Sequence, residues 1–475
     1  MRTAVRAFVL CGALGAAACA VGPVYKPPVA AAVPPAYKEL GEWKAAQPAD
    51  AAIRGKWWET FGDTRLNAFE EELTVSSQTL RAAQAQYLQA RALVRSARAA
   101  QAPQVGSTGS IAANNTSENR PLRSPTADTA YRDFLLRVDV AYELDVWGRV
   151  AKTVEANVAT AQASAADLEA VNLSLHAELA LDYFQLRGLD AEQQILDSSV
   201  ASYERALELT QNRFKGGLAS GVDVAQAETQ LETTRAQAID IRVRRAQFEH
   251  AMAALIGKPA GAFSVPAAPL DLAAPVIPAG LPAEILERRP DIAGAERRVA
   301  AANAQVGIIA AAFYPVFALT GSAGFESAAL GDWLKLASNF WSVVPTAAMA
   351  VFDGGRRRAA SDQARAGYER AVAVYQDTVL TAFREVEDNL AAMRILAEEA
   401  RTQDAAVAAA ERLLTLATNR YKGGVTTYLE VAAAQSAALT NQRTAANILS
   451  RRLTASVLLV KALGGGWNFR SLPAY

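Results

Sequence analysis

The chain has 475 residues, of which 51% are hydrophobic but only 7% aromatic. Because alanine carries much of the apolar share, along segments with few prolines, the composition favours long, closely packed helices over a bulky globular core. Lys plus Arg and Asp plus Glu both number 48, so no net charge draws the chain to nucleic acid or to an anionic membrane surface. We therefore expect no nucleic-acid partner.

Residues 1–18 are predicted to be a secretory signal peptide. Two arginines precede an apolar run at 7–14, which is far shorter than the roughly 20 residues that a membrane-spanning helix needs. Small residues then lead to Cys19, as in a bacterial lipobox, and we predict that Cys19 is a lipid attachment site. An acyl chain there would add about 0.8 kcal/mol of membrane affinity per buried CH₂. Ala16 stands where a lipobox usually has leucine, so ordinary cleavage after Ala18 remains the alternative.

The rest of the chain contains two copies of one repeat. The segment 212–218 (NRFKGGL) recurs 207 residues later as 419–425 (NRYKGGV), and further residues match at the same offset. Upstream the offset becomes 212, so the first copy holds about five extra residues, which we place in the polar stretch 114–128. The duplication divides the chain into a lipid-anchored, proline-rich tether, a first repeat, a linker, a second repeat and a tail, at 19–50, 51–260, 261–280, 281–466 and 467–475.

Each copy reads as a helix, a β-hairpin, a long helix, a turn and a return helix. Apolar residues before the first glycine pair step by three and four, which predicts a coiled-coil seam. The first long helix is expected from about Arg149 to Phe214, a length on the order of 95 Å. The glycine pairs at 216–217 and 423–424 are expected to end the long helices, since glycine tolerates the left-handed backbone of a helix C-terminus.

Four segments alternate between apolar and small or polar residues with the period of a β-strand, at about 105–116, 132–145, 315–325 and 341–352. Each is long enough to cross a bilayer at a tilt. A four-stranded sheet with open edges cannot remain in lipid, because each unpaired backbone group costs several kcal/mol there. Three chains that pool their strands would form a barrel with a lumen, whereas two would form one too narrow for a solute. The polar positions Arg137, Asp139 and Glu143 would then face the lumen.

No constellation of residues predicts an enzyme, a cofactor site or a metal site. The two cysteines, Cys11 and Cys19, precede residue 20, so the remaining chain has no thiol ligand. The two histidines, His176 and His250, lie in helical patterns with no second histidine at ligand spacing, and we expect both to be ordinary helix-face residues. The sequence also lacks a P-loop, a G-x-S-x-G motif and an H-E-x-x-H motif.

Several motifs resemble the outer membrane factor family, the TolC-like exit ducts, and in particular its lipoprotein branch that serves resistance-nodulation-division (RND) pumps. They lie at 22–25 (GPVY), 57–63 (WWETFGD), 143–149 (ELDVWGR), 281–298 around RRPD, and 352–356 (FDGGR). The resemblance implies a mainly α fold with a transmembrane β-barrel: a homotrimer with a twelve-stranded barrel in the outer membrane and a long helical tunnel in the periplasm. It also implies as partners a periplasmic adaptor, which meets the tunnel tips, and an inner-membrane pump of the RND type.

Carried onto this sequence, the resemblance implies two kinds of site. The adaptor-contacting tip turns are Lys215, Gly216, Gly217, Lys422, Gly423 and Gly424, and the gate is Tyr428, Leu429 and Glu430. Leu429 matches an apolar constriction residue. Many relatives carry an aspartate one turn later, where this chain has Ala433. Glu430 is the nearest carboxylate that could take the place of this aspartate. The alternative is that Glu430 is an ordinary solvated residue of the helix. We therefore expect the second helical hairpin to do more of the gating.

The predicted function is that of an outer-membrane channel subunit, a passive exit duct for drugs and other small toxic compounds in a tripartite efflux system. One alternative is the duct of a type I protein secretion system. Another is a periplasmic coiled-coil scaffold lipoprotein without a barrel, against which the four strand-like segments argue. The lipobox and the RRPD stretch favour a drug or metal pump over protein secretion.

Overall fold

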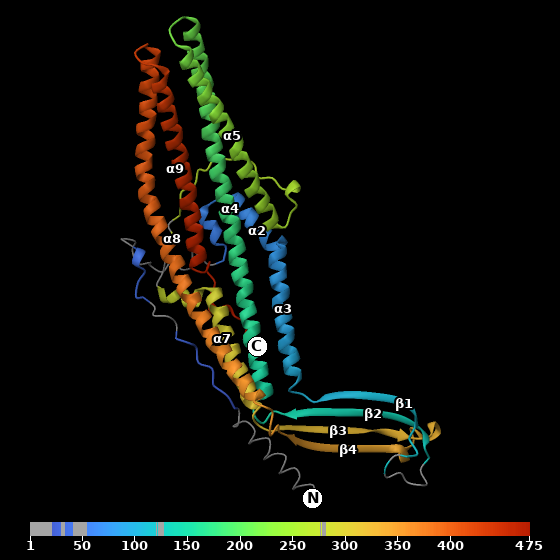
Figure 1. The fold of residues 1–475 in the computed structure, drawn as a ribbon. Helices are drawn as coiled ribbons and strands as arrows, with labels where there is room; N and C mark the ends of the chain where they lie inside the picture. The colour runs from blue at the N-terminus through green and yellow to red at the C-terminus, as the bar shows by residue number, and fades with distance from the viewer. Residues whose placement is uncertain are drawn as a thin grey trace.

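The computed structural model describes residues 21–29, 34–40, 55–119, 121, 128–275, 277 and 282–475. The predicted signal peptide and Cys19 lie outside the described residues. The molecule is elongated, with long helical hairpins rising side by side and a β-sheet that projects from the opposite end of the helices (Figure 1).

The two copies of the repeat produce the same succession of elements. The first comprises α2 (Thr64–Ser76), α3 (Gln78–Ala99), β1 (Gln104–Asn115), β2 (Ala130–Leu144), α4 (Arg149–Lys215) and α5 (Gly221–Ile256). The second comprises α6 (Ile285–Arg288), α7 (Pro290–Ala311), β3 (Val316–Ser327), β4 (Asn339–Ala348), α8 (Arg356–Lys422) and α9 (Tyr428–Ala462). Helices α4 and α8 each have 67 residues, so each is about 100 Å long. We call the pair α4/α5 hairpin 1 and the pair α8/α9 hairpin 2.

The sheet is antiparallel throughout, in the order β1-β2-β3-β4. The prediction for the fourth strand, about 341–352, is wrong at its end, because β4 ends at Ala348. Ala348 pairs with Val316, where β3 begins, so the residues after it have no partner strand in this chain. The extra residues of the first copy are shared between the β1–β2 loop and strand β2, which has 15 residues where β4 has 10.

The main apolar core lies where the two hairpins, α2 and α7 meet. The short helix η4 (Trp57–Phe61) inserts three aromatic side chains there, and Phe61 lies 4.9 Å from the Phe184 ring of α4. Here His176 differs from the expectation of a helix-face residue, because it is only 3% exposed. Trp58 stacks on it at 4.4 Å and covers that face of α4. His250 lies on an exposed helix face, as expected.

His176 forms a buried pair with Glu70 of α2. The imidazole Nδ1 lies 2.6 Å from a Glu70 carboxyl oxygen, and the Glu70 side chain is fully buried. Burial raises the pKa of Glu70 well above its ordinary value and lowers the pKa of His176 to about 4. Burial therefore favours the neutral form of both groups.

Candidate functional site: a two-faced sheet and two helical tips

The strand register gives the sheet one apolar face and one polar face. Phe134, Leu136, Val138, Val140 and Tyr142 of β2 share a face with the β3 residues Phe325, Ala323, Gly321 and Leu319, which lie opposite them. Trp341 and Val343 of β4 continue that face, and most of its large side chains are exposed. The opposite face carries most of the serine, threonine and charged side chains of the sheet, together with Leu135, Phe340 and Val344. Strands β1 and β4 are the edges of the sheet, and no further described strand pairs with either.

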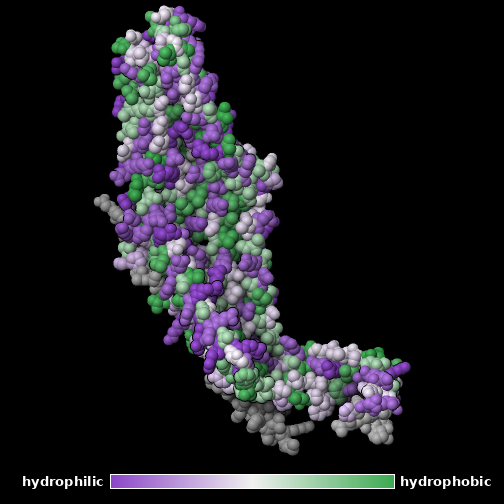
Figure 2. Space-filling model, in the orientation of Figure 1, coloured by the Kyte–Doolittle hydropathy of each residue, from purple (hydrophilic) through white to green (hydrophobic). Residues whose placement is uncertain are grey.

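The polar face holds all three predicted lumen residues. Arg137 and Asp139 form an ion pair at 3.1 Å between Nε and Oδ2. Glu143 lies at the end of β2 near the helices and receives two hydrogen bonds from Arg149, the first residue of α4, at 2.6 and 2.8 Å. Glu143 therefore fixes the strand-to-helix junction as well as lying on the polar face. The helical part of the molecule carries hydrophilic residues over most of the face seen in Figure 2.

The two tips are built alike at the ends of α4 and α8. Gly217 and Gly424 have φ values of 70° and 74°, in the left-handed region that glycine enters without strain. In each turn the residue after this glycine donates a backbone hydrogen bond to an arginine carbonyl, Leu218 to Arg213 at 2.8 Å and Val425 to Arg420 at 3.0 Å. The structure thus places Lys215, Gly216, Gly217, Lys422, Gly423 and Gly424 at the turns of the two hairpins, which Figure 1 shows at the far end from the sheet.

Asp223 and Arg213 of hairpin 1 join its tip to that of hairpin 2. Asp223 of α5 accepts a hydrogen bond of 3.2 Å from the backbone N–H of Tyr428, the first residue of α9. Arg213 donates to the Lys422 carbonyl at 3.0 Å, and its guanidinium lies 4.9 Å from the centre of the Tyr421 ring. Burial acts to raise the pKa of Asp223, but hydrogen bonds from Ser220 and Tyr428 outweigh it and hold the pKa below its ordinary value.

The predicted gate residues lie in three different environments. Tyr428 is 1% exposed and packs against Tyr421 at 5.5 Å between the rings. Its ring lies inside the hairpin pair, where it packs between the two hairpins. Leu429 is 64% exposed. Glu430 is also exposed and lies 3.6 Å from Arg420. Ala433 is exposed on the same side of α9 as Leu429, four residues on.

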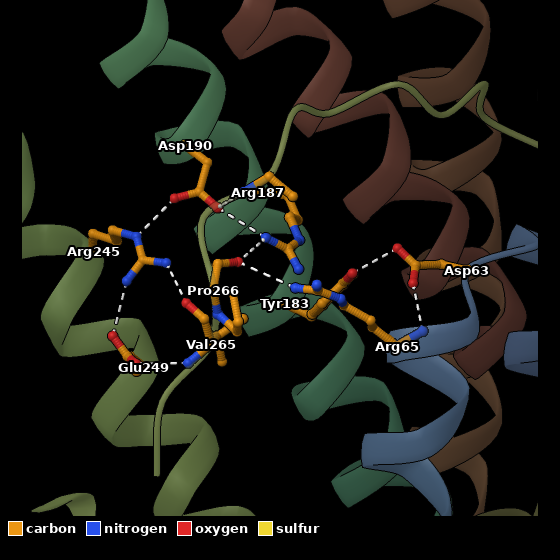
Figure 3. Close-up of polar contacts among 10 residues, drawn as sticks. Asp63, Arg65, Tyr183, Arg187, Asp190, Arg245, Glu249, Val265 and Pro266 are labelled. Atoms are coloured by element: carbon orange, nitrogen blue, oxygen red, sulfur yellow. Dashed lines mark hydrogen bonds and ion pairs between the residues drawn. The ribbon is translucent and has the colours of Figure 1, made fainter.

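A polar network holds the base of hairpin 1 to the linker between the repeats (Figure 3). Asp190 of α4 lies between two arginines, Arg187 at 2.9 Å and Arg245 at 2.7 Å. Arg187 donates to the Pro266 carbonyl, and Arg245 donates to the Val265 carbonyl and to Glu249. Glu249 in turn accepts from the Val265 N–H at 2.7 Å. The linker backbone is thus fixed between α4 and α5.

Hairpin 2 is held at its base by the described part of the N-terminal tether. Glu387 of α8 accepts hydrogen bonds from the backbone N–H groups of Lys38 and Glu39, at 2.7 and 2.9 Å. Glu39 accepts a bond of 2.6 Å from Arg394. Nearer the sheet, the tether hydrogen bonds to α7 through Tyr25 and Glu296. The tether therefore follows the helices from the sheet to the base of the hairpin, as Figure 1 shows.

The sequence places Tyr203 on the seam, and Arg213 and Asp223 in the first tip turn, but it gives no partner for these three residues and does not single out Gln435. The last of these is a buried residue of α9 that accepts bonds from Tyr428 and Tyr203. The spacing of Ser220 and Asp223 is a signal that could have identified the cap of α5, but the bond from Asp223 to the other hairpin has no local signal. Within the described residues, no cluster of His, Cys, Asp and Glu could hold a metal ion. None of the helices described is both long and apolar enough to span a bilayer.

Comparisons with known proteins agree with this architecture. The family described as outer membrane efflux protein matches the chain twice, at 71–258 and 281–465. The probable efflux pump outer membrane protein TtgC of Pseudomonas putida is 33% identical over 98% of this chain and 95% of its own length. The outer membrane protein OprJ of Pseudomonas aeruginosa is 33% identical over 96% of this chain and 95% of its own length.

Solved structures are similar over almost the whole chain. The outer-membrane channel OprN superposes with a TM-score of 0.87 at 30% identity, and covers 94% of this chain and 100% of its own. The open state of the MtrE outer membrane channel of Neisseria gonorrhoeae gives a TM-score of 0.83 at 26% identity, and covers 95% of this chain and 99% of its own. The relatives are channels rather than enzymes.

Proposed function

The chain belongs to the outer membrane efflux protein family and is the outer-membrane channel component of an efflux pump, and from that premise we propose that three copies assemble into one duct. The observation that carries the proposal is a sheet with two unlike faces and two open edges. Pairing β4 of one copy with β1 of the next would satisfy both edges. Three copies give twelve strands, enough to leave a lumen.

In this assembly the apolar face of the sheet meets lipid and the polar face lines the lumen. Arg137, Asp139 and Glu143 are the lumen charges of the proposal. Since Arg137 and Asp139 neutralise each other in part, the middle of the barrel would repel neither cations nor anions strongly. The helical hairpins extend the duct into the periplasm, and acylated Cys19 anchors the start of the tether in the outer membrane.

The tips of the duct meet a periplasmic adaptor, and the inner-membrane pump is of the RND type. The contact residues of the proposal are the tip turns Lys215 to Gly217 and Lys422 to Gly424. Next to these turns, Leu218, Val222 and Val425 expose most of their side chains, and such apolar groups beside lysines suit a protein partner. Three relatives are named as the outer membrane proteins of an antibiotic efflux pump, of a toluene efflux pump and of pyoverdine export. We propose small, chemically diverse molecules as the exported class here.

The gate of the proposal lies at the tip of hairpin 2. Leu429 is exposed on α9 in the single chain, so three copies would place three leucines around the axis as an apolar constriction. An apolar ring of this kind blocks ions because a narrow apolar constriction excludes the water that hydrates them. Glu430 would add a carboxylate beside each leucine, and Ala433 leaves the next turn without charge.

Replacing Leu429 by alanine tests this assignment. We expect Leu429→Ala to make the resting channel leakier in a planar bilayer and to change the antibiotic sensitivity of cells, because the constriction loses three isobutyl groups. Leu416→Ala is the matched control, since Leu416 on α8 is 62% exposed but is not part of the proposed gate. Unchanged single-channel conductance and unchanged sensitivity in Leu429→Ala would reject the gate.

A further inference from the structure

The loop between β3 and β4 exposes three leucine side chains. It spans 328–338 and forms two short 3-10 helices, η7 (Leu330–Asp332) and η8 (Leu336–Ser338). Leu330, Leu334 and Leu336 are 64%, 64% and 80% exposed. Figure 1 shows the loop at the end of the sheet that is far from the helices. Exposed apolar side chains gathered in this way mark an interaction surface.

The loop is folded onto the apolar face of the sheet. Its Trp333 ring lies 5.8 Å from the ring of Phe134, and Phe134 is buried although its neighbours on that face are exposed. Bonds within the loop fix its shape: the Ser338 hydroxyl donates to the Asp332 carbonyl at 2.7 Å, and Lys335 pairs with Asp332. The leucines are therefore held outward by an ordered loop on the side of the sheet that faces lipid in the proposed assembly.

Two cations belong to this end of the sheet. Lys335 belongs to the loop and is exposed. Arg132 lies on the same face of β2 as Phe134, two residues nearer the start of the strand, and is exposed. It makes no ion pair within the part of the chain that the structure describes. Leucines with adjacent cations and a tryptophan match the region where acyl chains meet phosphate headgroups.

We propose that the β3–β4 loop lies in the outer leaflet of the outer membrane, with its leucines among the acyl chains and with Arg132 and Lys335 at the phosphate groups. This inference rests on the proposed function, because that function directs the apolar face toward lipid. The loop of the first copy is different: residues 116–129 read TSENRPLRSPTADT, with a single leucine, and Glu118 is exposed. We therefore expect Glu118 to remain in water while the β3–β4 loop is seated in the membrane.

Single-cysteine reporters test the proposal on the full-length protein in lipid vesicles. The chain has no cysteine after residue 19, so the labelled parent protein measures any background from Cys19. Leu334→Cys, Val138→Cys and Glu118→Cys each receive an environment-sensitive fluorophore, and the vesicles contain phospholipids with a quencher near the headgroup. We expect about twofold quenching at position 334 and none at position 118.

The outcome at Val138 separates the two proposals. Quenching at 138 but not at 334 overturns the seating of the loop and leaves the duct intact. No quenching at either position rejects the orientation of the sheet, and with it the proposed function. A blue-shifted reporter at 334 that lipid quenchers do not reach means that a neighbouring protomer covers the loop, which also overturns the proposal.

A second measurement tests whether the cations interact with anionic lipid. Adding anionic phospholipid to neutral vesicles should increase the quenching at position 334, and Arg132→Gln in the same Leu334→Cys protein should reduce the increase. Arg365→Gln is the matched control, because Arg365 is an exposed arginine on α8, away from the loop. An equal response to anionic lipid in both variants overturns the role of Arg132.

Discussion

Hairpins 1 and 2 derive from one repeat, yet they are held at their bases by different groups. Hairpin 1 uses Arg187, Asp190, Arg245 and Glu249 to fix the linker. The positions 207 residues later hold Arg394, Ala397, Arg452 and Ser456. Hairpin 2 has therefore kept both arginines and lost both carboxylates, and Arg394 instead pairs with Glu39 of the tether. The base of hairpin 1 is fixed by a buried network with the linker. That of hairpin 2 is held by the tether and by Arg289, which is 7% exposed and donates to Glu385 of α8 and to the Ala462 carbonyl of α9.

At the tips, too, hairpin 1 supplies its own stabilising bonds, whereas hairpin 2 uses a residue from outside the hairpin. Ser220 and Asp223 form a complete capping box at the start of α5. Their equivalents in the second copy are Thr427 and Glu430, and Thr427 makes no side-chain cap. The first N–H of α9 is satisfied by Asp223 of hairpin 1 instead. Hairpin 2 thus depends on its neighbour at the tip.

The largest expected loss of stability follows from removing the Asp190 side chain. This side chain and that of Arg187 are both 3% exposed, so Asp190→Ala leaves buried arginine charge without its partner and should cost about 3–5 kcal/mol. Glu39→Ala removes the partner of Arg394 at a more exposed site and should cost less than about 1 kcal/mol. Thermal unfolding of the helical circular dichroism signal measures both. Equal losses in the two variants would show that the two bases are held equally.

The buried Glu70–His176 pair gives the next largest effect. The position equivalent to His176 in the second copy is Phe383, which packs against the apolar core. His176→Phe leaves the Glu70 carboxyl buried without its partner, and should cost about 1–3 kcal/mol. The double variant Glu70→Leu/His176→Phe removes both polar groups, and should recover most of that loss in the same unfolding assay. A double variant no more stable than His176→Phe alone would contradict the explanation.

The pair also predicts a pH profile. Between pH 4.5 and 6.5, the ordinary pKa values of the two groups, the unfolded pair holds its proton on the imidazole, whereas burial in the folded pair favours the proton on the carboxyl, so the two states bind similar numbers of protons and stability should change little. Above pH 6.5 the unfolded pair loses its proton, and stability falls until the raised pKa of Glu70 is passed. Below pH 4.5 the unfolded pair gains a second proton, and stability falls toward the lowered pKa of His176. The melting-temperature difference between wild type and the double variant, plotted against pH, should therefore show a plateau between pH 4.5 and 6.5 and a decline of wild-type stability on either side of it.

At the tips, Asp223→Ala should affect both hairpins at once. It removes one side-chain cap from α5 and the partner of the Tyr428 N–H, so the loss should be about 1–2 kcal/mol. Amide hydrogen exchange at the starts of α5 and α9 measures it, and both should exchange faster. In Ser220→Ala only α5 should respond. The lowered pKa of Asp223 means that its contribution is complete above pH 3.8 and is lost as the pH falls through the lower folded value. An unchanged α9 in Asp223→Ala would show that hairpin 2 caps itself.

The features that sequence predicted well are those with a local cause. The ends of α4 and α8 follow from glycines 216–217 and 423–424, and the two faces of the sheet follow from alternation along each strand. The end of β4 was misplaced because a strand ends where its partner ends, and Val316 lies 32 residues away. The burial of His176 could not be predicted, because helical spacing does not say which other segment covers a face of the helix. The second partner of Asp223 could not be predicted for the same reason, since it lies 205 residues away.

The smallest expected effect concerns Glu430, the repeat equivalent of Asp223. Among the described residues its one ion pair is with Arg420, at 3.6 Å with both side chains about half exposed, so Glu430→Gln should change stability by less than about 1 kcal/mol. Its charge matters more, because three copies would place three carboxylates beside Leu429, and their loss should lower the preference of the channel for cations over anions. Reversal potentials in a salt gradient measure that preference, and Glu398→Gln on α8 controls for a general change of charge. If Glu430→Gln leaves the preference unchanged, Glu430 is a solvated helix position, and the gate of hairpin 2 depends on its apolar ring alone.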